Sequence, residues 1–179
     1  MTSRQSEHPE RRRGVPILAI VLMLAGVVVG CAGSDGSASG VCSAPEHIVD
    51  SSGGGHALPG AYVVYDTYPP ASGRHLDARF APQPGAYTTP LSPVEQVTAL
   101  HQGMAVVVYD PDQVDDEGFE QLTSLTSGGD LVVVPADQAL PERAAIAITW
   151  WETRQLCSDI DESVIENATK EAAASASRH

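Results

Sequence analysis

The sequence predicts a small single domain of the α+β class, with a mixed or antiparallel sheet of about four to five strands and two to three helices. Two short runs, residues 104–109 and 131–134, are apolar at every position, as in strands that are buried on both faces. Two other segments carry helix start and stop signals. The length of 179 residues fits one domain with tails and not two domains.

The first expected strand is residues 61–65, which precede a long turn-rich segment. A helix is expected next, because Ser92 is a favourable N-cap residue and Pro93 occupies the first helical position. Glu95 completes a capping box, and Gly103 is a typical residue at the end of a helix. This helix leads directly into the first apolar run.

The second half of the domain is also expected to alternate between helices and strands. An acidic loop at 110–116 leads into a helix with apolar residues at helical spacing, which ends at the Gly-Gly pair 128–129. The strand at 131–134 and a further strand at 145–150 follow, and a helical tail begins at residue 161. Strand, helix and strand in this order form a candidate parallel crossover.

The first thirty residues predict an export signal. Residues 1–13 are polar and carry four arginines, whereas residues 15–29 are apolar except for one Pro and one Gly. Such a run is short for a membrane span and typical of a signal peptide. Val-Val-Gly before Cys31 resembles a bacterial lipobox, in which the cysteine is diacylated and becomes the first mature residue. The alternative is an uncleaved anchor helix, and the export route, Sec or twin-arginine, stays open.

The chain is therefore divided into four parts. We expect a lipoprotein signal peptide at 1–30, a Gly/Ser-rich tether at 31–44, a globular domain at 45–160, and a helical C-terminal tail at 161–179 with a frayed end. A tether of this composition is flexible and lets a domain reach away from a membrane surface. The expected location is the outer face of the cell membrane.

The charge of the chain excludes some partners. The sequence has 10 basic and 23 acidic residues, a formal net charge of −13, which argues against binding nucleic acid. Cleavage before Cys31 removes four arginines and two glutamates and leaves a net charge of −15. Anionic headgroups repel such a domain. Attachment to the membrane is therefore expected through the acyl chains.

Two cysteines remain once Cys31 is lipidated. In an oxidising compartment, Cys42 and Cys157 are expected to form a structural disulfide that ties the start of the domain to its end. The alternative is a redox or metal-binding pair, although the two residues are too far apart in sequence for a CxxC motif.

Several short motifs resemble a known bacterial family. In chain order they are Gly55-His56, Tyr65, Pro69-Pro70-Ala71-Ser72-Gly73-Arg74-His75, Gly85-Ala86-Tyr87, His101-Gln102-Gly103, Thr149-Trp150-Trp151 and Cys157. Their order and spacing resemble the family of the domain of unknown function 3105, over roughly residues 45–160. The Pro-Pro-x-Ser-Gly-x-His run is the most specific of them.

The helix before the first apolar run departs from the family pattern. Family members carry His-x-x-Glu-His-Gly there, and this chain has Thr98, His101 and Gln102 at the three positions. Because one residue turns a helix by about 100°, His101 does not take the place of either family histidine. The role of those histidines in this chain stays open.

The histidines that remain point to a metal site. His56 and His75 lie in Gly- and Pro-rich loops, His101 lies in the last turn of the helix, and Met104 follows it. Imidazole and thioether ligands favour copper over hard cations. The hypothesis is a copper site of the three histidines with Met104 as axial ligand. The competing interpretation is that the histidines form only hydrogen bonds and that Met104 is a core residue.

No catalytic motif accompanies these residues. Ser72 is not part of a Gly-x-Ser-x-Gly elbow, and the sequence has no phosphate-binding glycine loop. We therefore expect a non-enzymatic extracytoplasmic binding protein, anchored in the membrane through Cys31. The alternative is an accessory or interaction subunit of a membrane protein complex, without a metal. An enzyme with an unrecognised site is a third interpretation.

Overall fold

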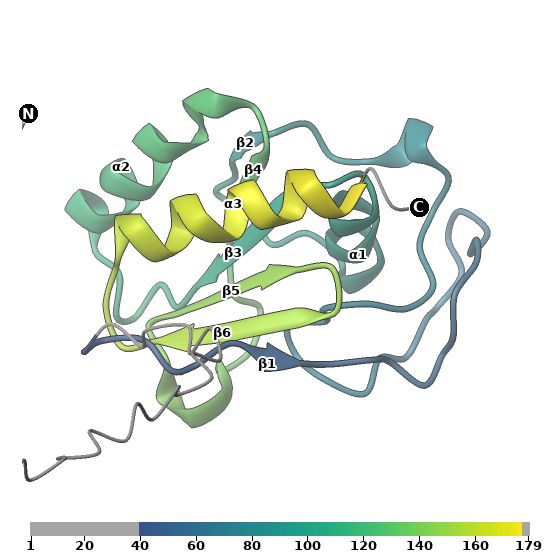
Figure 1. Ribbon diagram of the computed structural model, residues 1–179, viewed down its shortest axis with the longest axis horizontal. Coiled ribbons are helices and arrows are strands. Elements are labelled where there is room, and N and C mark those ends of the chain that lie inside the picture. The colour runs from purple at the N-terminus through teal and green to yellow at the C-terminus, as the bar shows by residue number, and fades with distance from the viewer. Residues whose placement is uncertain (1–39, 177–179) are drawn as a thin grey trace, which may run out of the picture. The chain divides into compact units, whose positions relative to one another are not determined.

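The structure, a computed structural model, describes residues 40–176, so the expected signal peptide and Cys31 lie outside the described residues. In the described part, six strands form one sheet with α1 on one face and α2 and α3 on the other (Figure 1). The helices are α1 (Pro93–His101), α2 (Asp116–Leu125) and α3 (Glu162–Ala176). The strands are β1 (Glu46–His47), β2 (Gly85–Ala86), β3 (Ala105–Tyr109), β4 (Leu131–Pro135), β5 (Ile146–Trp150) and β6 (Thr153–Cys157). Short 3-10 turns are formed by Ala78–Phe80, Thr126–Gly128 and Pro141–Arg143.

The sheet is mixed, and its strand order is β1-β6-β5-β3-β4-β2. β4 pairs in parallel with β3 and β2, and the other neighbours are antiparallel. The α+β class and the parallel pairing of the two apolar runs are therefore confirmed. The sheet exceeds the expected four to five strands because the sequence did not predict β1, β2 and β6. β1 and β2 are two residues long, too short to leave a periodic pattern in the sequence.

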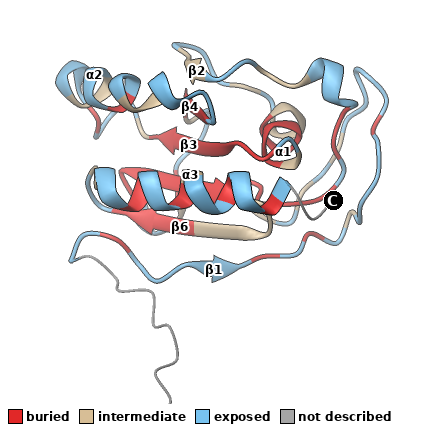
Figure 2. Ribbon diagram, turned by 45° about the horizontal axis from the view of Figure 1, so that its top comes forward, coloured by how far each residue is buried: buried red, intermediate tan, exposed pale blue. Residues whose placement is uncertain are grey.

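Both faces of the sheet are covered, so the central strands are buried throughout (Figure 2). Side chains of a strand point alternately to opposite faces. Val107 accordingly packs in one core cluster with Leu122 of α2 and Ile165 of α3. Val106 packs in a second cluster with Leu100 of α1. This two-sided burial explains why the strand sequences have no polar positions.

The expected helix starts are confirmed by their hydrogen bonds. The backbone N–H of Ser92 donates to a carboxylate oxygen of Glu95 at 2.9 Å, which is one half of a capping box. At the start of α2, the backbone N–H of Gly118 donates to the Asp115 carboxylate at 2.9 Å. α1 ends before Gly103, whose φ of 81° is favourable only for glycine.

The strand expected at 61–65 is absent, and that prediction was wrong. The segment lies beside the start of α1, where it lines a groove with Ser92, Pro93 and Val94. It has no strand as a neighbour there, and the Tyr62 side chain is 92% exposed. A β-prone composition predicts a strand only where a pairing partner is in reach.

Strand β6 was missed for the opposite reason. It begins Thr153-Arg154-Gln155, a polar sequence that does not look like a strand. β5 and β1 nevertheless pair with it on its two sides. A tight turn joins β5 to β6, with Glu152 at a φ of 58°. Pairing on both sides holds this segment in the sheet in spite of its composition.

The C-terminal helix continues further than expected. α3 extends to Ala176, and Ala172, in the tail whose end was expected to fray, is fully buried. The reason is a close contact at Gly103, where a Cβ atom would lie 2.4 Å from the Cβ of Ala176. Residues 177–179 lie outside the described residues. In the described part of the chain, no helix has the length and apolarity needed to cross a membrane.

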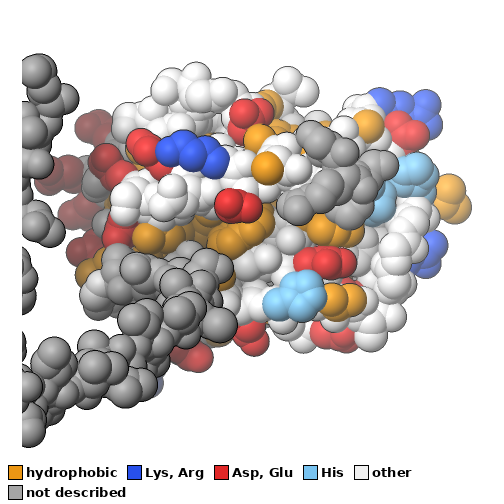
Figure 3. All heavy atoms as spheres, in the orientation of Figure 1, with side chains coloured by type: hydrophobic (Ala, Val, Ile, Leu, Met, Phe, Trp, Pro, Cys, Tyr) orange, Lys and Arg blue, Asp and Glu red, His pale blue; other side chains and the backbone are white. Residues whose placement is uncertain are grey.

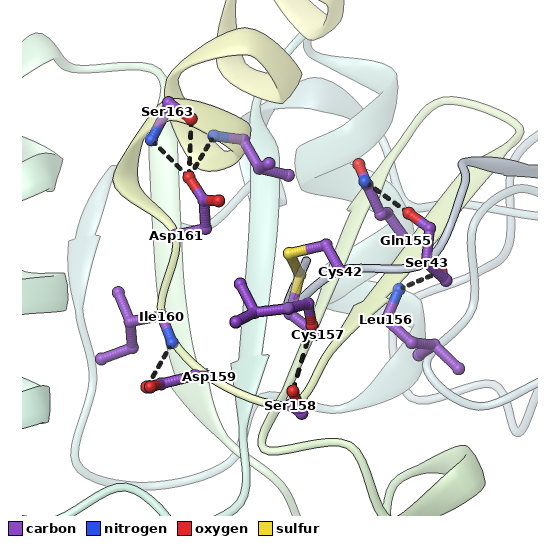
Figure 4. Close-up of a disulfide and its surroundings, with 12 residues drawn as sticks. Cys42, Ser43, Gln155, Leu156, Cys157, Ser158, Asp159, Ile160, Asp161 and Ser163 are labelled. Atoms are coloured by element: carbon purple, nitrogen blue, oxygen red, sulfur yellow. Dashed lines mark hydrogen bonds between the residues drawn. A yellow bond between two sulfur atoms is a disulfide. The ribbon is translucent and has the colours of Figure 1, made fainter. Parts of the chain in front are cut away.

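The Cys42–Cys157 disulfide is present and closes the N-terminal segment onto β6 (Figure 4). Cys42 is buried in the core cluster that contains α2 and α3. On either side of it, Ser43 and Val41 form backbone hydrogen bonds with Leu156 and Ser158. The folded part therefore includes residues 41–44, which the sequence placed in the tether.

Candidate functional site

Ser72, in the Pro-Pro-Ala-Ser-Gly run, fastens its loop to the segment after β1. Its side chain is buried, its hydroxyl donates to the carbonyl of Ile48 at 3.1 Å, and it accepts from the backbone N–H of Asp50 at 2.9 Å. A buried hydroxyl with both a donor and an acceptor partner contributes to stability instead of costing desolvation energy. This explains the serine at this position of the motif.

Gly73 stands next to a buried carboxylate. The Asp50 carboxylate is 5% exposed and accepts from the backbone N–H groups of Ser52 at 2.8 Å and Asp66 at 2.7 Å. A Cβ on Gly73 would lie 2.7 Å from the Ser52 hydroxyl oxygen and 3.1 Å from an Asp50 oxygen. The φ of 117° at Gly73 also excludes larger residues. The motif therefore needs glycine here for space and for conformation.

Tyr65 fastens the other end of the same loop. Its hydroxyl donates to the carbonyl oxygen of Arg74. Burial, together with the nearby Asp50 carboxylate, raises the pKa of Tyr65, so the hydroxyl keeps its proton. The Arg74 guanidinium in turn donates to the carbonyl of His56 at 3.2 Å. The motif residues thus hold the His56 and His75 segments side by side.

His75 has a defined tautomer. Its backbone N–H donates to the Gly55 carbonyl at 3.2 Å, its carbonyl accepts from Ala57, and its ring is almost completely buried. The ring Nδ1 lies 3.2 Å from the carbonyl oxygen of Gly73. Because a carbonyl only accepts, Nδ1 carries the proton and Nε2 keeps its lone pair.

Three imidazole rings meet at this point. The His75 ring stacks on that of His101, with centroids 3.7 Å apart and an angle of 17° between the planes. The His56 ring meets His75 edge to face at 5.2 Å. Burial, and secondarily the charge of His56, lower the pKa of His75, so this imidazole is neutral at neutral pH. The structure therefore brings together the three histidines that the sequence singled out.

Trp151 completes the cluster, and the sequence named it only as part of a family motif. Its ring centroid lies 5.5 Å from that of His101 and 6.2 Å from that of His75, both edge to face. It stands at the turn between β5 and β6. The sequence did contain a signal for this residue, an aromatic side chain directly after a buried strand. Residues at the ends of neighbouring strands lie together at one end of the sheet.

Thr98, one turn before His101 on α1, fixes the position of His101. Its hydroxyl accepts from the backbone N–H of Leu76 at 2.9 Å and donates to the carbonyl of Val94 at 2.6 Å. The hydrogen bond from Leu76 joins α1 to the residue after His75. His101 lies one turn further on the same helix, and its ring therefore reaches the His75 ring.

The rings do not yet have the geometry of a metal site. A bound ion lies about 2 Å from each ligating nitrogen, in the plane of its ring. Two nearly parallel rings that stack at 3.7 Å lie in separate planes, so they cannot share an ion without a turn of one ring. In residues 40–176, no three His, Cys, Asp or Glu side chains are already arranged to hold a metal ion.

Met104, the expected axial ligand, lies in the core. Its side chain is buried in the cluster that contains Leu100, Val106 and Leu156. A groove that includes Tyr65 lies apart from this residue, between residues 61–68 and the start of α1, with a volume of about 380 Å³. Of the four residues expected to bind copper, the described part of the chain brings together the three histidines and leaves Met104 in the core.

Comparison with known families places the chain. A family model described as "Protein of unknown function (DUF3105)" matches residues 56–178, which is well over half of the chain. The match includes the Pro-Pro-x-Ser-Gly-x-His run, the three clustered histidines and Trp151. No curated protein and no solved structure gives a match. The chain belongs to the DUF3105 family.

Proposed function

We propose that this protein is a non-enzymatic extracytoplasmic binding protein, held at the outer face of the cell membrane by a diacylated Cys31. The support comes from the sequence, in which a basic segment, an apolar run and a lipobox-like Val-Val-Gly-Cys follow one another. The disulfide between Cys42 and Cys157 agrees with an oxidising compartment.

The proposed ligand is a copper ion, bound by His56, His75 and His101. The observation that carries this proposal is the protonation state of His75, a neutral imidazole whose Nδ1–H donates to the Gly73 carbonyl. A metal-binding histidine needs this arrangement, because the carbonyl fixes the tautomer and leaves Nε2 as the ligand. Imidazoles bind copper well, whereas hard cations prefer oxygen. Met104 is left out of the proposed set because its side chain belongs to the core.

Binding requires one movement. The His101 side chain turns out of its stack with His75, so that both rings direct a nitrogen at the same point. His101 lies at the end of α1 and is only partly buried, so a change of rotamer leaves the helix in place. The ring of Trp151 then lies beside the site, where it excludes water.

Copper content tests this proposal. Full-length protein in detergent is incubated with copper under reducing and oxidising conditions, desalted, and assayed for metal. We expect about one copper ion per chain in the wild type, and a loss of most of it in His56→Ala, whose ring is exposed and whose replacement leaves the core intact. The matched control is His47→Ala, an exposed histidine outside the cluster. Equal copper in all three proteins would refute the His56 assignment.

The anchor has its own test. The Cys31→Ala variant should lose the lipid modification and leave the membrane fraction, or keep an uncleaved signal. A variant with a cleaved signal that stays in the membrane fraction as firmly as the wild type would contradict lipidation of Cys31.

The second candidate is an accessory or interaction subunit of a membrane complex, without a metal. It is favoured by the use of the motif's polar groups within the protein, where Ser72 and Tyr65 hold the loop as a structural clamp. Wild-type protein that binds no copper under either condition would favour this second function over copper binding.

A further inference from the structure

The last turn of α3 is fixed against the connection between α1 and β3. A Cβ on Gly103 would lie 2.4 Å from the Cβ of Ala176 and 3.4 Å from the carbonyl oxygen of Ala172, so α3 approaches this connection closely. Ala172 is fully buried, and the buried hydroxyl of Ser175 donates to its carbonyl at 2.7 Å. Packing therefore defines the point that α3 reaches.

The histidine cluster lies at the same end of the sheet. β3 and β5 are antiparallel, so the connection before β3 and Trp151, which follows β5, lie together. His101 stands two residues before Gly103, and its ring lies against those of His75 and Trp151. The last turn of α3 lies beside α1 (Figure 1 and Figure 2). Histidine side chains reach the surface at this end of the molecule (Figure 3).

The sequence places one more histidine within reach of the cluster. Ser177, Arg178 and His179 follow Ala176 and lie outside the described residues. Three Cα-to-Cα steps span at most about 11 Å, and the two steps from Gly103 back to His101 span at most about 8 Å. A side chain on so short a connection has an effective concentration of at least about 1 mM at the cluster.

The proposed copper site has a position for a further ligand. Cu(II) prefers a tetragonal set of nitrogen and oxygen ligands, whereas the proposed site supplies three imidazoles. Met104, the residue expected to add to them, belongs to the core. The indole of Trp151 lies edge to face with His101, and its nitrogen only donates hydrogen bonds. The fourth position is therefore left to water or to another part of the chain.

We propose that His179 is the fourth ligand of the copper site, bound through an imidazole nitrogen. This inference rests on the proposed binding of copper by the three clustered histidines. The chemistry favours His179 over its neighbours, because imidazole binds copper, whereas the guanidinium of Arg178 keeps its proton and has no lone pair to give. Metal sites closed by protein ligands retain their ion, while catalytic sites keep an open position. A fourth imidazole thus suits a binding protein.

Copper binding by a His179→Ala variant tests this inference. Full-length protein in detergent is loaded with Cu(II), and its affinity is measured by competition with a chromogenic chelator. We expect His179→Ala to keep about one copper ion per chain and to bind it at least about tenfold more weakly than the wild type. X-ray absorption at the copper edge should show one coordinated imidazole fewer in the variant than in the wild type.

The matched control is Arg178→Ala, which changes the neighbouring residue and leaves the imidazole in place. It should keep the affinity and the number of coordinated imidazoles of the wild type. A similar loss of affinity in both variants, with the imidazole count unchanged, would show that residues 177–179 act without ligating the ion and would refute the assignment of His179.

The outcomes separate this inference from the copper site itself. If the wild type binds copper and His56→Ala does not, but His179→Ala equals the wild type in affinity and imidazole count, the site of three histidines stands and the fourth ligand is wrong. If the wild type binds no copper, the proposed function and this inference fall together.

Discussion

The imidazole rings of His75 and His101 stack at 3.7 Å, although one residue lies in a loop and the other at the end of α1. The stack joins the loop of the Pro-Pro-Ala-Ser-Gly run to the helix, beside the hydrogen bond from Leu76 to Thr98. It also occupies the space in which both rings would have to direct their nitrogens at a common ligand. Binding and packing therefore compete for the same two side chains.

We predict that the free energy of unfolding rises with pH in the range below pH 6.5. Burial and the neighbouring His56 lower the pKa of His75 in the folded protein from its ordinary value of 6.5. The unfolded chain therefore binds the proton more readily, and acid favours unfolding in the window below pH 6.5. Urea titrations of the wild type and of His75→Gln at several pH values measure this slope, which should be smaller in the variant.

The control for the pH effect is His47→Gln, because His47 is exposed. It should keep the wild-type slope. Equal slopes in the wild type and His75→Gln would show that other groups cause the pH dependence.

We predict that Gly103→Ala destabilises the protein by about 2–4 kcal/mol, since it adds overpacking to backbone strain. The new Cβ would lie 2.4 Å from that of Ala176, and the φ of 81° is unfavourable for alanine. Gly129→Ala is the matched control, with a φ of 87° and no atom within 4 Å of the new Cβ. It should cost only about 1 kcal/mol, from backbone strain alone. Equal losses in urea unfolding would argue against the contact between Gly103 and α3.

We predict that Ser72→Ala costs about 1–3 kcal/mol in urea unfolding. The variant leaves the carbonyl of Ile48 and the N–H of Asp50 without their hydroxyl partner in a buried place. The control, Ser127→Ala, changes an exposed serine and should stay within about 0.5 kcal/mol of the wild type. A Ser72→Ala variant as stable as this control would show that the clamp is not needed for folding.

We predict that reduction of the Cys42–Cys157 disulfide lowers the stability by about 4–5 kcal/mol, because it closes a long loop in the unfolded chain. Unfolding midpoints with and without reductant measure this difference. The Cys42→Ser/Cys157→Ser double variant should have the stability of the reduced wild type and no response to reductant. Thiol titration of the unfolded, unreduced wild type should find neither cysteine free.

The elements that the sequence predicted correctly carry their information locally. The capping residues Ser92 and Glu95 fix the start of α1 whatever surrounds it, and the runs of β3 and β4 show their burial by composition alone. The failures are segments whose state depends on a partner. Residues 61–65 have a strand composition and no strand beside them, whereas β6 has a polar composition and a strand on each side.

The candidate site, too, could be predicted from the sequence only in part. The sequence identified His56, His75 and His101 as residues of interest, and the motif around Ser72 and Gly73 marked their loop. It did not indicate that the rings stack or that Trp151 stands beside them, and it left two interpretations of Met104, of which the core position is the one observed. Ring geometry depends on the crossing of a loop, a helix end and a hairpin turn, which are far apart in the chain.

The sequence by itself determined the class of the fold and the two helices with clear start signals, because composition and local hydrogen bonding specify these features. Its short motifs also resembled the family to which the chain belongs. Only the tertiary structure decided which histidines meet, which apolar residues stay exposed, and how far α3 extends. These properties depend on contacts such as that between Gly103 and Ala176, which form only after distant parts of the chain have packed.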